Sequence, residues 1–197
     1  MKLHYRKYGE GQPLVILHGL FGSSDNWQTL GKKFAENFEV YLVDQRNHGH
    51  SPKSNEFNYQ LLSDDLYKLI ADLELENIIL IGHSMGGKAA LLFAEKYPEL
   101  VHSLVLRGIF LCRKADINWF YQKGAHEIYP DYWDTFISDI PIKERNNILE
   151  AFHNRIHGQD KNISLNLCEK WAEKDSRIKL FKLTSNSGSG PARNFAI

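Results

Sequence analysis

The stretch from residue 78 to residue 96 constrains this chain more than any other. Ile78-Ile79-Leu80-Ile81 is a continuous apolar run bounded by glycine, which predicts a strand buried on both faces. Gly82-His83-Ser84-Met85-Gly86-Gly87 follows, and a helix-forming run then extends from Lys88 to Lys96. The glycines permit a turn too tight for a Cβ, and such a turn raises the Ser84 hydroxyl at the end of the strand. We therefore expect a nucleophilic serine in a strained backbone turn.

A second glycine-rich loop complements this serine. Leu14-Val15-Ile16-Leu17 predicts another buried strand, and it runs directly into His18-Gly19-Leu20-Phe21-Gly22-Ser23-Ser24. Backbone N–H groups in such loops can stabilise the oxyanion that forms when a serine attacks a carbonyl. We expect the N–H groups of Leu20 and Met85 to be the two donors, with Phe21 as the neighbouring candidate.

Helical patterns separate the strand-like segments. Val40–Val43 and Leu104–Leu106 are expected to be the next strand and the fifth strand, and Leu3–Arg6 alternates as an edge strand does. One helix is expected from Asn26 to Phe38, and another is expected to begin near Ser63. Strands that alternate with helices predict an α/β fold with a mostly parallel sheet flanked by helices. Ligands of such sheets bind beyond the carboxyl ends of the strands, where both glycine loops lie.

The loop after Val43 contains charged residues and histidines that could belong to an active site, a metal site or the loop's own structure. Asp44 and Arg46 follow a strand at the expected active edge, but a carboxylate and a guanidinium so close together are typical of residues that pin a loop. His48 and His50 are interpreted as loop residues rather than as a metal pair, because no carboxylate or cysteine joins them in the motif. We expect no metal site and no cofactor.

Composition excludes several classes of function. With 197 residues, 43% of them hydrophobic, the chain can bury one substantial core. The net charge is zero and no basic stripe is present, which disfavours nucleic-acid binding. No apolar run approaches the roughly 20 residues that a membrane span needs. The polar start of the chain has no apolar signal core, so we expect a cytoplasmic protein in which Cys112 and Cys168 are buried thiols.

The amino-acid composition of the chain changes after Gly108. Ile109–Lys174 is rich in aromatic residues and helix formers and has no further strand of the buried type, which predicts a helical lid over the active edge of the sheet. We therefore expect a core over residues 1–108, a lid or cap over 109–183 and a disordered Ser/Gly-rich tail over 184–197. The edge of the strand at 104–106 would then invite a homodimer, unless Ile178–Leu183 covers it.

Three motifs of the first half resemble the α/β-hydrolase superfamily: His18–Ser23, Asp44–Gly49 and Gly82–Lys88. Residues 1 to about 103 are similar to small bacterial esterases and acyl-thioesterases. From about 104 to 174 the chain resembles the lid of prolyl aminopeptidases (proline iminopeptidases). This second resemblance is carried by Leu106-Arg107-Gly108-Ile109-Phe110, Trp119-Phe120-Tyr121-Gln122, Gly124-Ala125, Pro130-Asp131 and Ile140-Pro141. The resemblance implies an α/β-hydrolase fold with a helical lid and a truncated C-terminal part of the sheet.

The resemblance also implies roles for residues of the lid. Phe110 and Phe120 would occupy apolar positions that face the substrate, and a carboxylate near Trp171, Glu173 or Asp175, would hold a substrate ammonium group. Phe21 and His83 adjoin the expected oxyanion donors and the serine, and are further candidates for substrate binding.

The catalytic acid and base are not evident in the sequence. The fold supplies them after the serine, yet none of the four downstream histidines follows a strand in the Gly-His context that the fold uses. These histidines are His102, His126, His153 and His157. The last two share a helical face at i, i+4, a spacing more typical of solvated side chains than of a metal site. We expect no complete triad within the chain.

Three hypotheses follow. The first is a serine hydrolase that acts on carboxylic esters or thioesters through a Ser84 acyl-enzyme, impaired where acid and base are lacking. The second keeps this nucleophile but removes N-terminal proline from a short peptide, as the lid resemblance implies. The third is an inactive hydrolase-fold module that binds small acyl ligands or a partner subunit.

Overall fold

The structure, a computed structural model, describes residues 1–20, 22–156, 158–163 and 165–167. It divides into two compact units, Met1–Leu111 and Cys112–Ile197. The expected boundary between core and lid, after residue 108, lies close to this division. Several sequence predictions fall outside the described residues: the strand-like segment 178–183, the tail 184–197, Phe21, His157, Cys168, Glu173 and Asp175.

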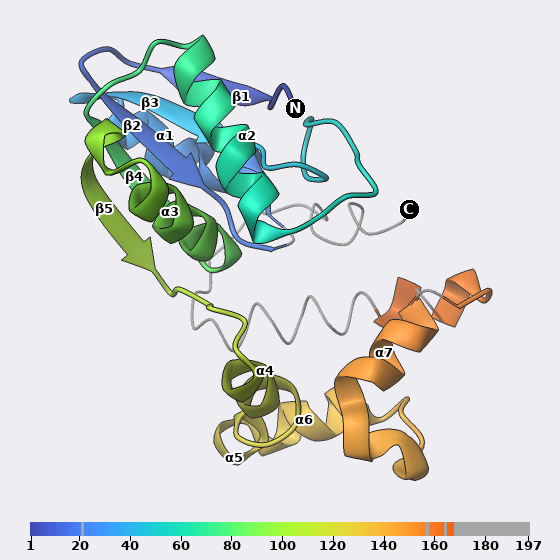
Figure 1. The fold of residues 1–197 in the computed structure, drawn as a ribbon. Helices are drawn as coiled ribbons and strands as arrows, with labels where there is room; N and C mark the ends of the chain where they lie inside the picture. Colours follow the sequence, from blue (N-terminus) through green and yellow to red (C-terminus); the bar gives the residue numbers. More distant parts are fainter. Residues whose placement is uncertain (21, 157, 164, 168–197) are drawn as a thin grey trace. The chain divides into compact units, whose positions relative to one another are not determined.

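The first unit contains a five-stranded sheet in the order β1-β3-β2-β4-β5 (Figure 1). The strands are β1 (Tyr5–Tyr8), β2 (Gln12–Leu17), β3 (Phe38–Val43), β4 (Ile78–His83) and β5 (Val101–Arg107). β1 pairs antiparallel with β3, and the other three pairs are parallel. The predicted α/β fold with a mostly parallel sheet is therefore confirmed, and the carboxyl ends of β2, β3, β4 and β5 share one edge of the sheet.

Helices cover both faces of this sheet. α2 and α3 lie on one face and α1 lies on the other (Figure 1). The helical elements of the unit are η1 (Ser24–Trp27), α1 (Gln28–Phe34), α2 (Tyr59–Asp72), α3 (Met85–Lys96) and η2 (Pro98–Leu100). Val15 and Leu80 belong to the buried cluster under α2 and α3, whereas Leu14 and Ile81 belong to the cluster on the opposite face. Burial on both faces explains why these strands read as continuous apolar runs.

The helix predicted over Asn26–Phe38 is wrong in its extent. A 3-10 turn precedes α1, which ends at Phe34, and Phe38 is the first residue of β3. Trp27 is buried, but Leu30 is 40% exposed, so the aromatic and aliphatic residues of this segment do not form one buried helical stripe.

The described part of the second unit is helical. Its elements are α4 (Lys114–Tyr121), α5 (Ala125–Ile128), α6 (Pro130–Ile137), η3 (Ile142–Asn147) and α7 (Ile148–Ile156). They enclose a separate apolar cluster that includes Phe136 and Phe152, whose stacked rings lie 4.4 Å apart between centroids. Within residues 112–156, 158–163 and 165–167 no strand is present, in agreement with the sequence pattern.

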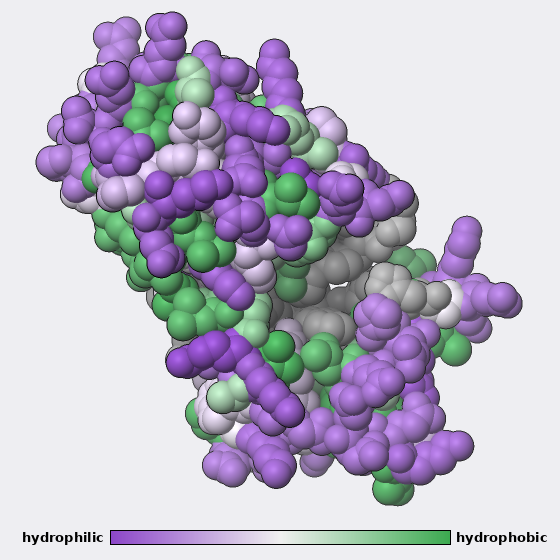
Figure 2. Space-filling view, in the orientation of Figure 1, coloured by the Kyte–Doolittle hydropathy of each residue, from purple (hydrophilic) through white to green (hydrophobic). Residues whose placement is uncertain are grey.

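The surface is mainly hydrophilic on the face drawn in Figure 2, with hydrophobic side chains gathered over β5. Val105 and Leu106 of this strand are 47% and 38% exposed. In the part of the chain that the structure describes, no helix combines the length and the apolar character needed to cross a membrane.

Candidate active site

Ser84 occupies the turn between β4 and α3. Its backbone has φ +53° and ψ −116°, in the left-handed half of conformational space that a residue with a Cβ rarely adopts. Three backbone hydrogen bonds hold this conformation: the Ser84 N–H donates to the Arg107 carbonyl at 3.1 Å, and the Ser84 carbonyl accepts from Gly87 at 3.0 Å and Phe110 at 3.3 Å. The strand-turn-helix geometry is that expected of a nucleophile elbow.

Glycines make this turn sterically feasible. A Cβ on Gly86 would lie 2.4 Å from the His18 carbonyl oxygen and 2.7 Å from that of Leu17. A Cβ on Gly82 would lie 2.6 Å from the Cα of Gly87. The start of α3 therefore packs directly against the end of β2, and this close approach positions the serine over the sheet edge.

The first glycine loop lies against the serine. A Cβ on Gly19 would lie only 2.9 Å from the Ser84 Cβ, so the two predicted loops meet at this point. The Gly22 N–H donates to the Gly19 carbonyl at 3.1 Å and closes the loop as a turn around Leu20. Met85 is the first residue of α3, where a helix leaves backbone N–H groups without an intrahelical acceptor. The arrangement brings together the segments that carry both expected oxyanion donors.

His18 fixes the first loop rather than acting as a base. Its Nδ1 donates to the Gly19 carbonyl at 2.7 Å, and its Nε2 accepts from the Gln45 N–H at 3.1 Å, which assigns the proton to Nδ1. Burial and the nearby His48 lower the pKa of His18 from 6.5 to about 4, so the ring is neutral at pH 7. The Gln45 side chain also donates to the His18 carbonyl at 2.7 Å.

A cationic and aromatic group lies beside the serine. His83 Nδ1 is 3.0 Å from the carbonyl oxygen of Arg107 and 3.2 Å from its Nη1. The Trp27 ring lies 5.8 Å from the His83 ring and 5.8 Å from the Arg107 guanidinium carbon. His83 was expected near the substrate, whereas Arg107 and Trp27 were not. The position of Arg107 at the carboxyl end of β5 is the signal that could have identified it.

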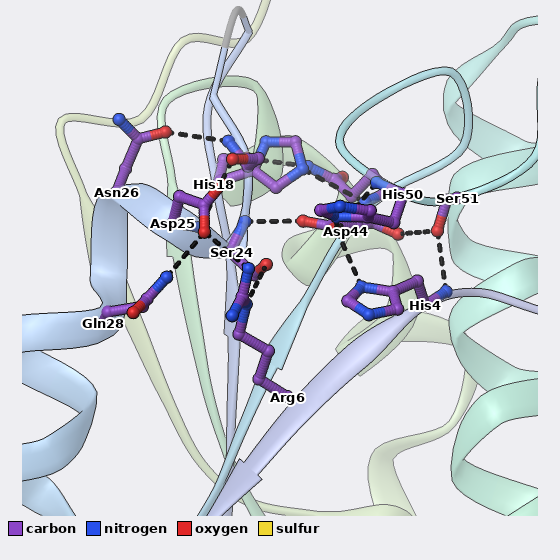
Figure 3. Close-up of polar contacts among 12 residues, drawn as sticks. His4, Arg6, His18, Ser24, Asp25, Asn26, Gln28, Asp44, His50 and Ser51 are labelled. Atoms are coloured by element: carbon purple, nitrogen blue, oxygen red, sulfur yellow. Dashed lines mark hydrogen bonds and ion pairs between the residues drawn. The ribbon is translucent and has the colours of Figure 1, made fainter. Parts of the chain in front are cut away.

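Asp44 anchors the loop that follows β3 (Figure 3). The carboxylate is fully buried and accepts hydrogen bonds from the Ser24 and His50 N–H groups and from His4 Nδ1. Burial alone would raise the pKa of Asp44, but these hydrogen bonds outweigh it and lower the pKa below its usual value. The predicted loop-pinning role fits Asp44, although its partner is not Arg46, whose Nε donates to Asp65 at 2.6 Å.

A family comparison places these features in context. The family described as the alpha/beta hydrolase fold matches residues 12–190 of the chain. The chain belongs to this family. The resemblance inferred from the three motifs of the first half is thereby confirmed at the level of the α/β-hydrolase superfamily.

Curated relatives of this α/β-hydrolase chain are proline iminopeptidases. That of Xylella fastidiosa (strain 9a5c) is 36% identical over 87% of the chain and 56% of its own length, and that of Arabidopsis thaliana is 34% identical over 83% and 44%. The chain thus spans about half the length of the curated relatives that it matches.

Solved structures with this fold include a marine microorganism esterase. It has a TM-score of 0.57 and 28% identity, over 96% of the chain and 66% of that protein. An epoxide hydrolase, CorEH, has a TM-score of 0.57 over 98% of the chain, but at 23% identity it supports the fold alone.

The described histidines of the first unit do not complete a triad with Ser84. His102 is the second residue of β5, at the end of the sheet opposite the elbow, as expected. His126 and His153 belong to the second unit, in α5 and α7. Among the described residues of the first unit, Met1–Leu111, no hydrogen bond joins a histidine to the Ser84 hydroxyl.

The remaining predicted substrate contacts are three phenylalanines. Phe110 donates its backbone N–H to Ser84 and therefore lies at the elbow. Phe120 belongs to α4 of the second unit, where its ring packs edge-on against Tyr121 at 4.8 Å. Phe21 lies outside the described residues.

Proposed function

We propose that the protein is a serine hydrolase that acts on carboxylic esters or thioesters through an acyl-enzyme on Ser84. One observation carries this proposal: Ser84 has a left-handed backbone between β4 and α3, with Gly19 packed against its Cβ. Ser84 is only 4% exposed, and the proposal is that a carbonyl entering beyond the sheet edge reaches it between the two glycine loops, whose backbone N–H groups can stabilise an oxyanion.

The proposed reaction begins when the Ser84 Oγ attacks the acyl carbonyl carbon. Negative charge develops on the carbonyl oxygen, and the N–H groups of Leu20 and Met85 stabilise it. Collapse of the tetrahedral intermediate breaks the bond to the alcohol or thiol and leaves the acyl group on Ser84, from which water releases a carboxylic acid. The proton of the serine must leave as the new bond forms, and a histidine normally accepts it.

The proposed reaction does not require a complete triad in this chain. Oxyanion stabilisation and substrate binding without a triad still accelerate acyl transfer by roughly 10³–10⁴-fold over water. We therefore expect activated esters, whose leaving group needs no proton, to react faster than ordinary esters.

Covalent labelling tests the role of Ser84. Fluorophosphonate treatment followed by intact-mass measurement should add one phosphonyl group to the wild-type protein and none to Ser84→Ala. Ser103→Ala, which changes an exposed serine of β5, is the matched control and should be labelled as the wild type is. A folded wild-type protein that resists labelling, yet is stabilised by short acyl ligands, would instead support an inactive binding module.

Removal of N-terminal proline is a second candidate. The names of the curated relatives favour it, and so does the lid sequence around Trp119 and Phe120. A proline arylamide compared with a short-acyl nitrophenyl ester and a thioester separates the two candidates. Faster Ser84-dependent release from the proline arylamide would replace the ester proposal with the aminopeptidase.

A further inference from the structure

We propose that His4, Asp44 and His50 form a binding site for one divalent transition-metal ion, best matched by Zn²⁺. His4 directly precedes β1, Asp44 directly follows β3, and His50 lies in the loop after Asp44. Each contributes one ligand atom, and these atoms all lie within 4.8 Å of one another. The site is distinct from the elbow, because β2 lies between β3 and the elbow strand β4.

The distances between the ligand atoms suit a small cation. His4 Nδ1 lies 2.8 Å from Asp44 Oδ2, and His50 Nδ1 lies 3.6 Å from the same oxygen. In a tetrahedral zinc site with bonds of about 2.0–2.1 Å, neighbouring ligand atoms lie roughly 3.3 Å apart. The two observed distances bracket this value, and the third pair of ligand atoms lies within 4.8 Å, so the two imidazole rings would turn to close the site around an ion. Figure 3 shows both imidazoles beside Asp44.

The carboxylate is already oriented for coordination. Asp44 is fully buried, and the Ser24 N–H fixes its Oδ1 at 2.5 Å while the backbone N–H of His50 fixes Oδ2 at 3.0 Å. Oδ2 also lies 2.8 Å from His4 Nδ1, and a metal ion bound here would replace the proton between these two atoms. Hydrogen bonds that hold a ligating carboxylate in place strengthen a metal site.

Solvent can reach the two imidazoles. The side chains of His4 and His50 are 37% and 63% exposed, and their ring centroids lie 4.9 Å apart. A metal ion can therefore enter from solvent, with water completing its coordination. Two imidazole nitrogens favour Zn²⁺ and its transition-metal neighbours over Mg²⁺ and Ca²⁺, which prefer oxygen ligands. A bound ion would tie the start of β1 to the loop after β3.

Isothermal titration calorimetry with Zn²⁺ at neutral pH tests the site. The wild-type protein should bind one ion here, with release of a proton. His50→Ala removes the imidazole but keeps the backbone N–H that holds Asp44, and His4→Gln keeps a hydrogen-bond donor near Asp44. Each should weaken this binding by more than roughly 100-fold, since even outer-shell changes cost about 10- to 100-fold. Asp44→Asn is not used, because this residue also anchors the loop.

Two control variants separate this site from other histidines. His102→Ala and His153→Ala change histidines outside the cluster and should leave the affinity unchanged. Zn²⁺ should also raise the melting temperature of the wild type and of both controls, but not that of His50→Ala. Equal zinc affinity in the wild type, His4→Gln and His50→Ala would overturn the proposal. So would loss of binding in His153→Ala alone, or the absence of binding to the wild type.

Discussion

At the scale of single residues, the position of Ser84 depends on the glycines that surround it. Gly86 is the most restrictive of these, because an added Cβ would meet two backbone carbonyl oxygens of the β2 end, neither of which can rotate away. The close contact between α3 and β2 is thus part of the site and not only of the core.

We predict that Gly86→Ala destabilises the protein and suppresses labelling of Ser84. Relief of the clash requires α3 or β2 to shift, and overpacking of this kind costs roughly 1–3 kcal/mol or more of unfolding free energy. Urea denaturation at pH 7 and the rate of fluorophosphonate labelling are the two measurements. Glu95→Ala, on the exposed side of the same helix, is the control; an unchanged Gly86→Ala variant would show that the loops are less tightly packed.

His18 provides a second prediction, which concerns pH. In the unfolded chain His18 takes up a proton near pH 6.5, whereas in the folded protein it does so only near pH 4. Between these values the unfolded state binds more protons, so stability falls as the pH is lowered from 6.5 to 4 and is unaffected by this group above that window. The expected loss is roughly 3 kcal/mol, and the lowered pKa of His48 acts in the same direction.

Urea midpoints measured at half-unit steps of pH test this expectation. His18→Gln, which cannot titrate, should flatten the slope between pH 6.5 and 4 even if it lowers stability at pH 7. Asp44 also has a lowered pKa, but its contribution disappears only as the pH falls through the acidic pKa range of a carboxyl. An equal slope in His18→Gln and the wild type would assign the acid sensitivity to other groups.

The residues of the site differ in how far the sequence identifies them. Ser84 and Gly19 lie in motifs that can be recognised from a few neighbouring residues. For Ser84, the strand β4 before it and the helix α3 after it fix the geometry of the turn. His4 is forty positions from Asp44, and their contact depends on the antiparallel register of β1 against β3. No local pattern contains that register, so the sequence does not show that His4 reaches Asp44. Asp44 and His50 lie in one loop, but their contact depends on the fold of that loop, which sequence spacing alone does not give.

At the scale of elements, the predicted strands were more accurate than the predicted helix ends. Buried strands follow from continuous apolar runs, but a helix begins where its first N–H groups find an acceptor. α2 begins at Tyr59 rather than near Ser63, because the Asn58 side chain accepts a hydrogen bond from the Leu61 N–H at 2.8 Å. Asparagine is common in loops as well, so this cap was not distinctive in the sequence.

We predict that Asn58→Ala lowers the free energy of unfolding by about 1 kcal/mol, the usual cost of losing a side-chain cap. The residue caps α2, which covers one face of the sheet through Leu62 and Leu66. Chemical denaturation of this variant should be compared with that of Asn58→Ser, whose hydroxyl can accept the same hydrogen bond. If both variants are destabilised equally, the Asn58 side chain acts in some way other than as a cap.

At the scale of the whole molecule, alternation of strands and helices was sufficient to predict the fold class. It could not identify the groups that would complete the site. The matched region is about half the length of the curated relatives. The proline iminopeptidase relatives match 87% and 83% of the chain, so their similarity extends over both halves of the sequence. The chemistry at Ser84 is common to the ester and the aminopeptidase hypotheses.

The last prediction concerns assembly through β5. Within the described residues this strand pairs with β4 alone, and its Val105 and Leu106 side chains are exposed. An edge of this kind favours pairing with a second copy of the chain. We expect sedimentation velocity to show association that increases with protein concentration. Val105→Lys should abolish it, because a lysine on an edge strand opposes pairing, whereas Leu91→Lys on α3 should not. A wild-type protein that stays monomeric, or one that loses association equally in both variants, would exclude β5 as the interface.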